Sequence, residues 1–137
     1  MYGKLKRGES INLPDGSLLH STDVLGNSKP GRIVTILGDT RPCEAAVQLA
    51  QDADVLVHES TFLHELAETA YTYHHSTARQ AAEAAKRAGA KQLFLTHFSS
   101  RYKYNDQLQQ LEREAREVFP HSDLAKEHVM YPILRHG

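Results

Sequence analysis

The stretch STARQAAEAAKRAGAKQLFLTH, residues 76–97, combines the signals of a helix with those of a strand. Thr77 and Gln80 have the spacing of a capping box, which predicts that a helix begins here. Gly89 is placed to end that helix, and the apolar run 92–95 predicts a strand that ends at His97. Small side chains share one helix face, which lets the helix lie close to a sheet: Ala78, Ala81, Ala82, Ala85 and Ala88.

The same alternation continues on both sides of this stretch. Strands are predicted at residues 32–37, 54–57 and 129–134. Helices are predicted from Pro42 to about 51, over about ten residues up to about Ala70, and from Leu108 to Val118. Strands that alternate with helices predict a mainly parallel sheet with right-handed crossovers. Residues 31–137 therefore form a series of strand–helix repeats.

Residues 1–30 differ from the rest of the chain. The apolar runs 11–13 and 17–19 flank the turn triplet Pro14-Asp15-Gly16, which predicts a β-hairpin followed by a loop. We interpret residues 1–137 as a single unit in which residues 1–30 are the lead-in to the strand–helix repeats of residues 31–137.

Composition excludes several classes of protein. With 137 residues, 40% hydrophobic, the chain is long enough for one modest core. Its net charge of −1 argues against a strongly basic nucleic-acid coat protein, although a local basic patch is compatible with it. No run is long enough to span a membrane, and no secretory signal is visible. One cysteine, Cys43, fits a reducing compartment, so we expect a cytoplasmic protein.

Three polar side chains follow predicted strands: Asp39, His58 and His97. Ligands bind outside the carboxyl ends of the strands in parallel sheets, so these residues mark a candidate site. Asp39 is either a metal-bridging carboxylate or a loop cap, and His97 is either a metal ligand or a structural histidine. Two ligands fall short of a catalytic zinc site, which typically has three and a water.

Two further motifs each allow two readings. His58-Glu59 is either a general acid with a carboxylate neighbour or a solvated strand end. His75-Ser76-Thr77 is either a phosphate site at a helix N-terminus or a plain N-cap, and spacing alone favours the N-cap.

Five motifs occur together and in order: YGKLKRG at 2–8, GDTRPC at 38–43, HESTF at 58–62, HSTA at 75–78 and LTHFSSRY at 95–102. In this combination the chain resembles the C-terminal half of the ribonuclease Z family, tRNA 3′-processing endonucleases of the metallo-β-lactamase fold. The resemblance implies half of an αβ/βα sandwich, with a mixed sheet and helices on one side. It also implies a precursor tRNA substrate and two zinc ions in a complete site.

The resemblance assigns roles to individual residues. It implies that Asp39 bridges the zinc ions, that His97 binds one of them and that His58 assists the leaving oxygen. It implies that substrate contacts come from Thr61, Ser76, Thr77 and Arg101.

The family's H-x-H-x-D-H motif, which carries most zinc ligands, is absent from this sequence, as is the arm that grips tRNA. We therefore expect a fragment that is inactive alone and binds zinc weakly. Its uncovered sheet face is expected to pair with a second copy or with a complementary N-terminal half. Two alternatives are a non-catalytic assembly or tRNA-contact module, and another hydrolase of the same fold.

Overall fold

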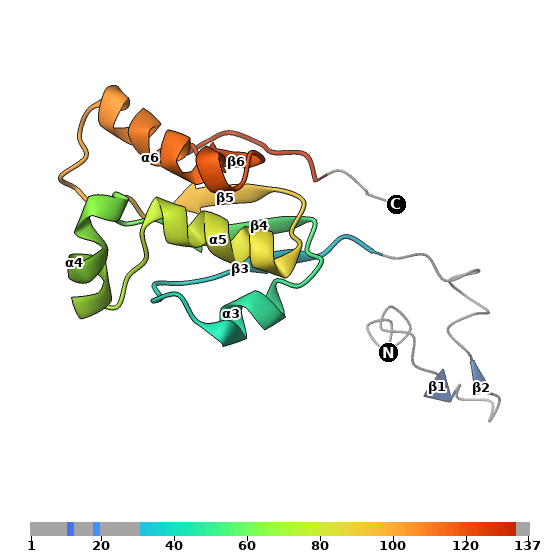
Figure 1. Cartoon of the computed structure of the whole chain (residues 1–137). Coiled ribbons are helices and arrows are strands. Elements are labelled where there is room, and N and C mark those ends of the chain that lie inside the picture. The colour runs from blue at the N-terminus through green and yellow to red at the C-terminus, as the bar shows by residue number, and fades with distance from the viewer. Residues whose placement is uncertain (1–10, 13–17, 20–30, 134–137) are drawn as a thin grey trace. The chain divides into compact units, whose positions relative to one another are not determined.

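The computed structural model describes residues 11–12, 18–19 and 31–133 (Figure 1). The chain divides into two compact units, Met1–Gly31 and Arg32–Gly137. In the first unit, β1 (Ile11–Asn12) pairs antiparallel with β2 (Leu18–Leu19), as the hairpin prediction requires. The turn triplet at 14–16 lies outside the described residues.

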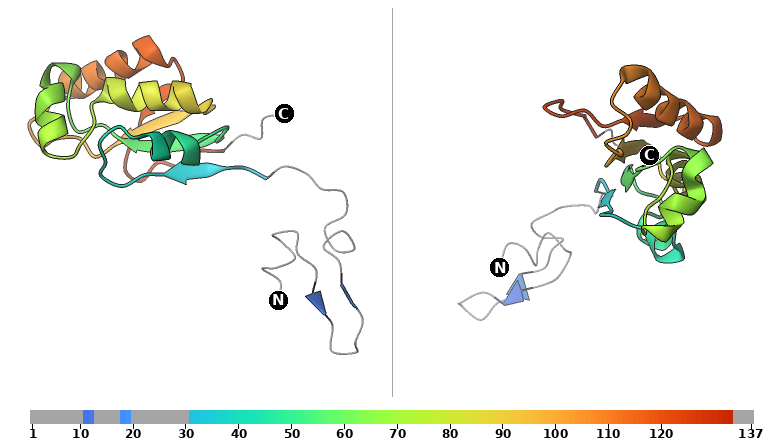
Figure 2. Two further views of the ribbon diagram at one scale, coloured as in Figure 1. Left: turned by 60° about the horizontal axis from the view of Figure 1, so that its bottom comes forward. Right: turned by 90° about the vertical axis from the view of Figure 1, so that its left-hand side faces the viewer.

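The second unit contains a four-stranded sheet in the order β3-β4-β5-β6. Its strands are β3 (Val34–Ile36), β4 (Val55–Glu59), β5 (Leu93–Thr96) and β6 (Ser122–Leu124). Every pairing among them is parallel, so the predicted mixed sheet is parallel throughout in the described part of this unit. Figure 2 shows the helices gathered on one face of this sheet, as expected.

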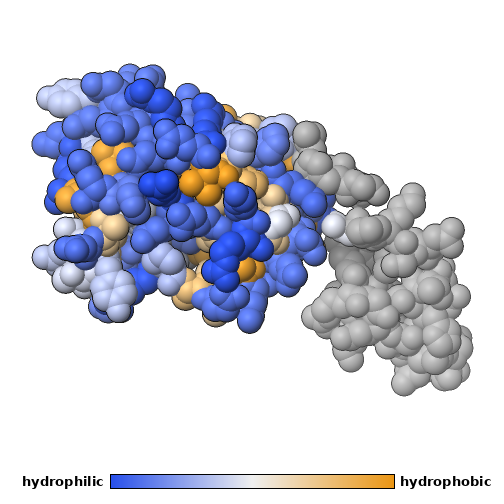
Figure 3. Space-filling model, in the orientation of Figure 1, coloured by the Kyte–Doolittle hydropathy of each residue, from blue (hydrophilic) through white to orange (hydrophobic). Residues whose placement is uncertain are grey.

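The helix layer consists of α3 (Glu44–Leu49), α4 (Ala67–Thr72), α5 (Ala78–Ala88) and α6 (Asn105–Val118), with the short 3-10 helix η1 (His64–Leu66) before α4. The capping box of Thr77 and Gln80 is formed, and Gly89 ends α5 with a left-handed φ of 71°. The alanine face of α5 is buried over the fully enclosed Leu56, Leu93, Leu95 and Leu111. The side of the molecule seen in Figure 3 is mainly hydrophilic, with apolar side chains showing between the helices.

Two element predictions were wrong. No strand forms at residues 129–133, and the last strand is instead Ser122–Leu124, whose polar residues hide it from a search for apolar runs. Pro42 does not lie in the first turn of α3, because Cys43 is the N-cap and the helix begins at Glu44.

The face of the sheet opposite the helices exposes apolar side chains. In β3 the side chains alternate: Thr35 is buried, whereas Val34 is 41% and Ile36 is 71% exposed. Such alternation is what a strand shows when only one of its faces is covered. The open face is therefore apolar and uncovered at β3, whereas Phe94 of β5 packs against the ring of Tyr131, with centroids 4.4 Å apart.

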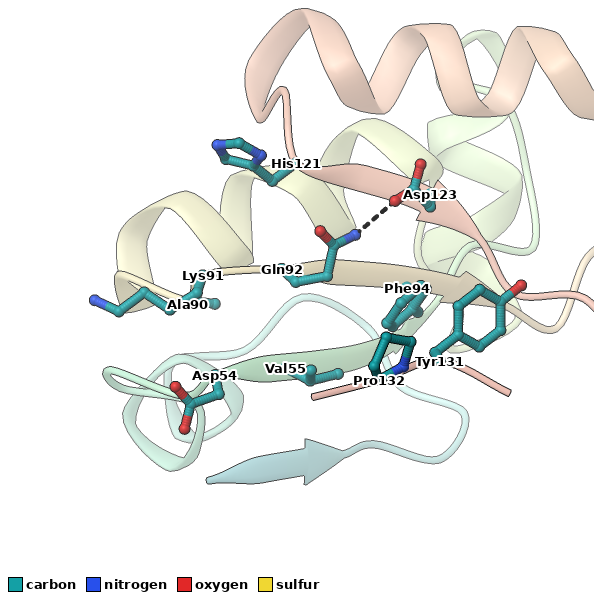
Figure 4. Close-up of a pocket in the computed structure, with 10 residues that line it drawn as sticks. All are labelled: Asp54, Val55, Ala90, Lys91, Gln92, Phe94, His121, Asp123, Tyr131 and Pro132. Atoms are coloured by element: carbon teal, nitrogen blue, oxygen red, sulfur yellow. Dashed lines mark hydrogen bonds between the residues drawn. The ribbon is translucent and has the colours of Figure 1, made fainter. Parts of the chain in front are cut away.

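A cavity of about 510 Å³ opens on the same face near the starts of β4, β5 and β6 (Figure 4). Val55, Phe94 and Tyr131 contribute its apolar wall, and the Gln92 amide donates a 2.8 Å hydrogen bond to Asp123 beside it. The cavity lies at the opposite ends of the strands from Asp39 and His97. Within the described residues, no helix is both long and apolar enough to cross a membrane.

Candidate metal and catalytic site

Asp39, His75 and His97 converge at the carboxyl-end edge of the sheet. Each offers one potential ligand atom, and these atoms all lie within 4.8 Å of one another. Nε2 of His97 is 3.4 Å from a carboxylate oxygen of Asp39, and the rings of His75 and His97 stack with centroids 5.3 Å apart. The side chains of Asp39 and His97 are 58% and 50% exposed, so a substrate can reach the group.

The local backbone turns sharply at this edge. His97, directly after β5, and His74, directly before His75, both adopt left-handed conformations with φ of 57° and 64°. Non-glycine residues in this region are uncommon and cluster where a structure holds functional side chains in place.

Glu59, the last residue of β4, lies at the centre of the loops that carry these side chains. It is 1% exposed and accepts hydrogen bonds from five donors. Backbone amides of Thr40, Thr61 and Ser76 supply three of them, and the Thr61 hydroxyl and Nδ1 of His75 supply the others. One buried carboxylate therefore joins the loops after β3 and β4 to the loop before α5.

This network fixes the orientation of both histidine rings. Nδ1 of His75 donates to Glu59 over 2.9 Å, and Nδ1 of His97 lies 3.0 Å from the Thr61 hydroxyl. The Thr61 hydroxyl donates to Glu59, so it accepts from His97. Each ring therefore uses Nδ1 for a hydrogen bond within the network and leaves Nε2 for a ligand or a proton. Histidines that bind metals typically have their tautomer set in this way, by a hydrogen bond at the other ring nitrogen.

The prediction that His58 acts on the substrate does not fit this geometry. His58 is fully buried, on the side of β4 that Leu56 also faces, whereas Glu59 points the other way. Its Nδ1 donates to the Glu59 carbonyl, and Nε2 has no hydrogen-bond partner among the described residues. Burial lowers the pKa of His58 below 6.5, although its hydrogen bond to Glu59 and the charge of Glu59 act in the opposite direction.

Three of the four predicted substrate contacts are enclosed. Thr61 is 5% exposed, Ser76 and Thr77 are fully buried, and the Ser76 hydroxyl donates to the carbonyl of Thr40 over 2.6 Å. In this structure the hydroxyls of Thr61 and Ser76 hold the loops together, and their contact with a substrate stays a prediction. Arg101 alone of the four is exposed, with its guanidinium 5.2 Å from the centroid of the Phe62 ring.

Three backbone amides at the N-terminus of α5 donate to groups of the protein itself. The amide of Ser76 donates to Glu59, that of Thr77 to Gln80, and that of Ala78 to the carbonyl of Phe62. The N-cap at Thr77 is formed, and a phosphate contact by the 75–77 motif stays a prediction.

Sequence reasoning missed His75 as a member of the cluster and Glu59 as its organiser. His75 does not follow a strand, and the predicted site contained only residues that do. Glu59 was treated as a neighbour of His58, although strand alternation already separates the two side chains. The signal was present in the two motifs HEST and HST, which meet through Glu59 and Ser76.

The donor set fits a divalent metal ion. A carboxylate and two imidazoles are ligands that zinc accepts, and three protein donors are the usual number in catalytic zinc sites. The structure thus adds a third potential ligand to the two that the sequence predicted. Nitrogen and oxygen donors of this kind also accept other divalent transition metals.

The chain is similar to known proteins of one superfamily. Residues 13–98 match the family described as the beta-lactamase superfamily domain. The chain is 49% identical over 135 residues to ribonuclease Z of Bacillus thuringiensis (strain Al Hakam), and 50% identical over 133 residues to that of Bacillus cereus (strain B4264). These alignments cover 98% and 97% of this chain but only 44% and 43% of the relatives.

Two solved structures share the fold. Human tRNase Z, short form, matches with a TM-score of 0.59 and 32% identity over 77% of this chain and 34% of that chain. The metallo-beta-lactamase fold protein YhfI from Bacillus subtilis matches with a TM-score of 0.59 and 29% identity over 68% of this chain and 37% of that chain. The chain belongs to the beta-lactamase superfamily, and its sequence corresponds to the C-terminal part of ribonuclease Z.

Proposed function

We propose that this chain supplies one side of the active site of a zinc-dependent endoribonuclease that processes the 3′ end of precursor tRNA. The observation that supports it best is the cluster of Asp39, His75 and His97, in a chain about half identical to ribonuclease Z along nearly its whole length.

In this proposal Asp39 and His97 are metal ligands, and His75 is kept for proton transfer. The remaining ligands come from the H-x-H-x-D-H motif that the family resemblance implies. Asp39 carries two oxygens, which allows it to bridge two ions, and His97 presents Nε2 toward it at 3.4 Å. Zinc bound there would stabilise charge on the phosphate oxygens and supply hydroxide near neutral pH.

His75 takes the role of general acid in place of His58. Glu59 gives His75 an ionised acceptor, whereas Thr61 gives His97 a neutral one. A carboxylate that orients an imidazole and balances its positive charge is the arrangement used for proton transfer in hydrolases. His75 therefore donates a proton to the leaving oxygen, and His97 serves as a metal ligand.

Arg101 contacts a substrate phosphate. Its side chain is exposed four residues after His97 and lies over Phe62, which in turn makes an edge contact with the His75 ring at 6.4 Å. A guanidinium placed in this way can form paired hydrogen bonds to a phosphate beside the cluster.

The open face of the sheet binds the remainder of the domain. Val34 and Ile36 are exposed there, and the chain spans less than half the length of the curated relatives that it matches. A complementary N-terminal half is the partner that this length difference favours, and a second copy of the chain is the alternative. The isolated chain is then expected to be inactive and to bind zinc weakly, and the complete enzyme works in the cytoplasm on precursor tRNA.

A chimera tests the proposal. This chain replaces the matching part of the Bacillus cereus ribonuclease Z, and cleavage of a precursor tRNA is measured with zinc present. We expect cleavage at the tRNA 3′ end that Asp39→Ala abolishes. A folded chimera that loads zinc but cuts no precursor would contradict the proposal.

A further inference from the structure

A second arginine is held on an aromatic ring near the cluster. The guanidinium carbon of Arg41 lies 4.0 Å from the centroid of the Tyr71 ring, and Nε of Arg41 donates a 2.6 Å hydrogen bond to the Tyr71 carbonyl. Tyr71 is nevertheless 64% exposed. A large aromatic ring that stays exposed while it is held in a fixed orientation is suited to contact a partner.

Covalent and hydrogen-bond connections place this pair beside the cluster. Arg41 is two residues from Asp39, so their Cα atoms are at most about 7 Å apart. The carbonyl of Thr40 accepts from Ser76, directly after His75. The Arg41–Tyr71 contact thus bridges the loop that carries Asp39 and the segment that leads to His75.

The pair presents two planar groups and a positive charge. Flat aromatic and guanidinium surfaces stack on nucleobases, and recognition of single-stranded RNA relies on such stacking. Arg101 on Phe62 lies in the loop of His97, so one arginine–aromatic pair belongs to each of the loops that carry Asp39 and His97.

We propose that the Arg41–Tyr71 pair stacks on an unpaired base next to the phosphodiester that reaches the cluster, and so recognises the single-stranded 3′ extension of the substrate. This inference rests on the proposed function, because it takes RNA as the ligand. It adds a contact that discriminates unpaired from paired nucleotides, whereas Arg101 contacts only phosphate.

Fluorescence anisotropy on the full 137-residue chain provides the test. The probes are an acceptor-stem RNA minihelix with a short unpaired 3′ extension, and the same RNA with abasic sugars in that extension. The wild-type chain is expected to bind the base-bearing extension about tenfold or more tightly than the abasic one, the effect of one stacked base. Tyr71→Ala removes this difference and Tyr71→Phe keeps it.

Tyr104→Ala is the matched control, because Tyr104 is a similarly exposed tyrosine (69%) at the start of α6. It is expected to leave the difference between the two probes unchanged. The inference is overturned if the wild-type chain binds both probes equally. It is also overturned if the difference between the probes survives Tyr71→Ala or disappears with Tyr104→Ala. If Arg101→Ala still weakens binding in that case, the proposed function stands. Failure of the wild-type chain to bind any RNA at low salt overturns the inference, and cleavage by the chimera then decides the proposed function separately.

Discussion

Glu59 and His75 are joined by a 2.9 Å hydrogen bond between a carboxylate oxygen and Nδ1, sixteen residues apart in the chain. The other oxygen of Glu59 accepts from Thr61, which pairs with His97. A single buried carboxylate thus sets the tautomers of both histidines that face Asp39.

Replacing Glu59 tests this organising role. Glu59→Gln puts an amide NH₂ among backbone and hydroxyl donors, so at least one buried donor loses its acceptor. We expect the free energy of unfolding to fall by about 1–3 kcal/mol. Urea denaturation measures it, with Glu83→Gln as the exposed control, expected to change it by less than about 0.5 kcal/mol. Equal stability of the two variants would show that Glu59 does not hold the loops.

The burial of His58 makes stability depend on pH. Its pKa is lowered in the folded state, so between that value and about 6.5 the unfolded chain binds more protons at this residue. The contribution of neutral, buried His58 to the free energy of unfolding is complete above pH 6.5. It is lost as the pH falls toward the pKa of His58 in the folded state. Urea unfolding should therefore show that the wild-type chain loses stability from pH 7.5 to pH 5. The loss between the same two pH values should be smaller in His58→Gln.

Another exposed histidine provides the comparison for this pH effect. His64→Gln should keep the wild-type dependence, because His64 lies exposed at the start of η1. A pH dependence that is unchanged in His58→Gln would count against a neutral, buried His58.

Metal affinity separates the two histidines at the cluster. His97→Ala is expected to weaken zinc binding by more than about tenfold. Removing a residue that only hydrogen-bonds to a metal ligand already lowers metal affinity by about tenfold or more. His75→Ala should weaken it less, because we assign His75 to proton transfer. Competition titration with a zinc-sensitive dye measures both affinities, and a larger loss in His75→Ala would reverse the two assignments.

The open sheet face predicts association. Ile36→Asp places a charge on that face and should convert associated chains to monomers in sedimentation velocity. Leu49→Asp is the matched control, because Leu49 is 65% exposed but lies on α3 in the helix layer. If Leu49→Asp has the same effect as Ile36→Asp, the sheet face is not the interaction surface.

The sequence predicted most elements of the fold because their signals are local. The alanine face, the capping box of Thr77 and the stop at Gly89 all lie within α5 itself. The strand Ser122–Leu124 was not predicted, because it is polar and forms by pairing with β5.

The site was predicted only in part, since its centre depends on long-range contacts. Asp39 and His97 follow strands, and a parallel sheet brings such residues to one edge. Glu59 and His75 meet only after folding, and the burial of Thr61, Ser76 and Thr77 follows from that meeting. A hydroxyl in a motif does not reveal whether it faces substrate or holds a loop.

We propose that His75, held by Glu59, performs the proton transfer that the family resemblance implies for His58. Single-turnover cleavage of precursor tRNA by the Bacillus cereus chimera tests it most directly, with zinc content measured for each variant. We expect His75→Ala to lower the cleavage rate by about 100-fold or more while zinc is retained, because a general acid typically contributes at least that much. His58→Gln should cleave at nearly the wild-type rate. A fully active His75→Ala variant, or a zinc-loaded but inactive His58→Gln variant, would contradict it.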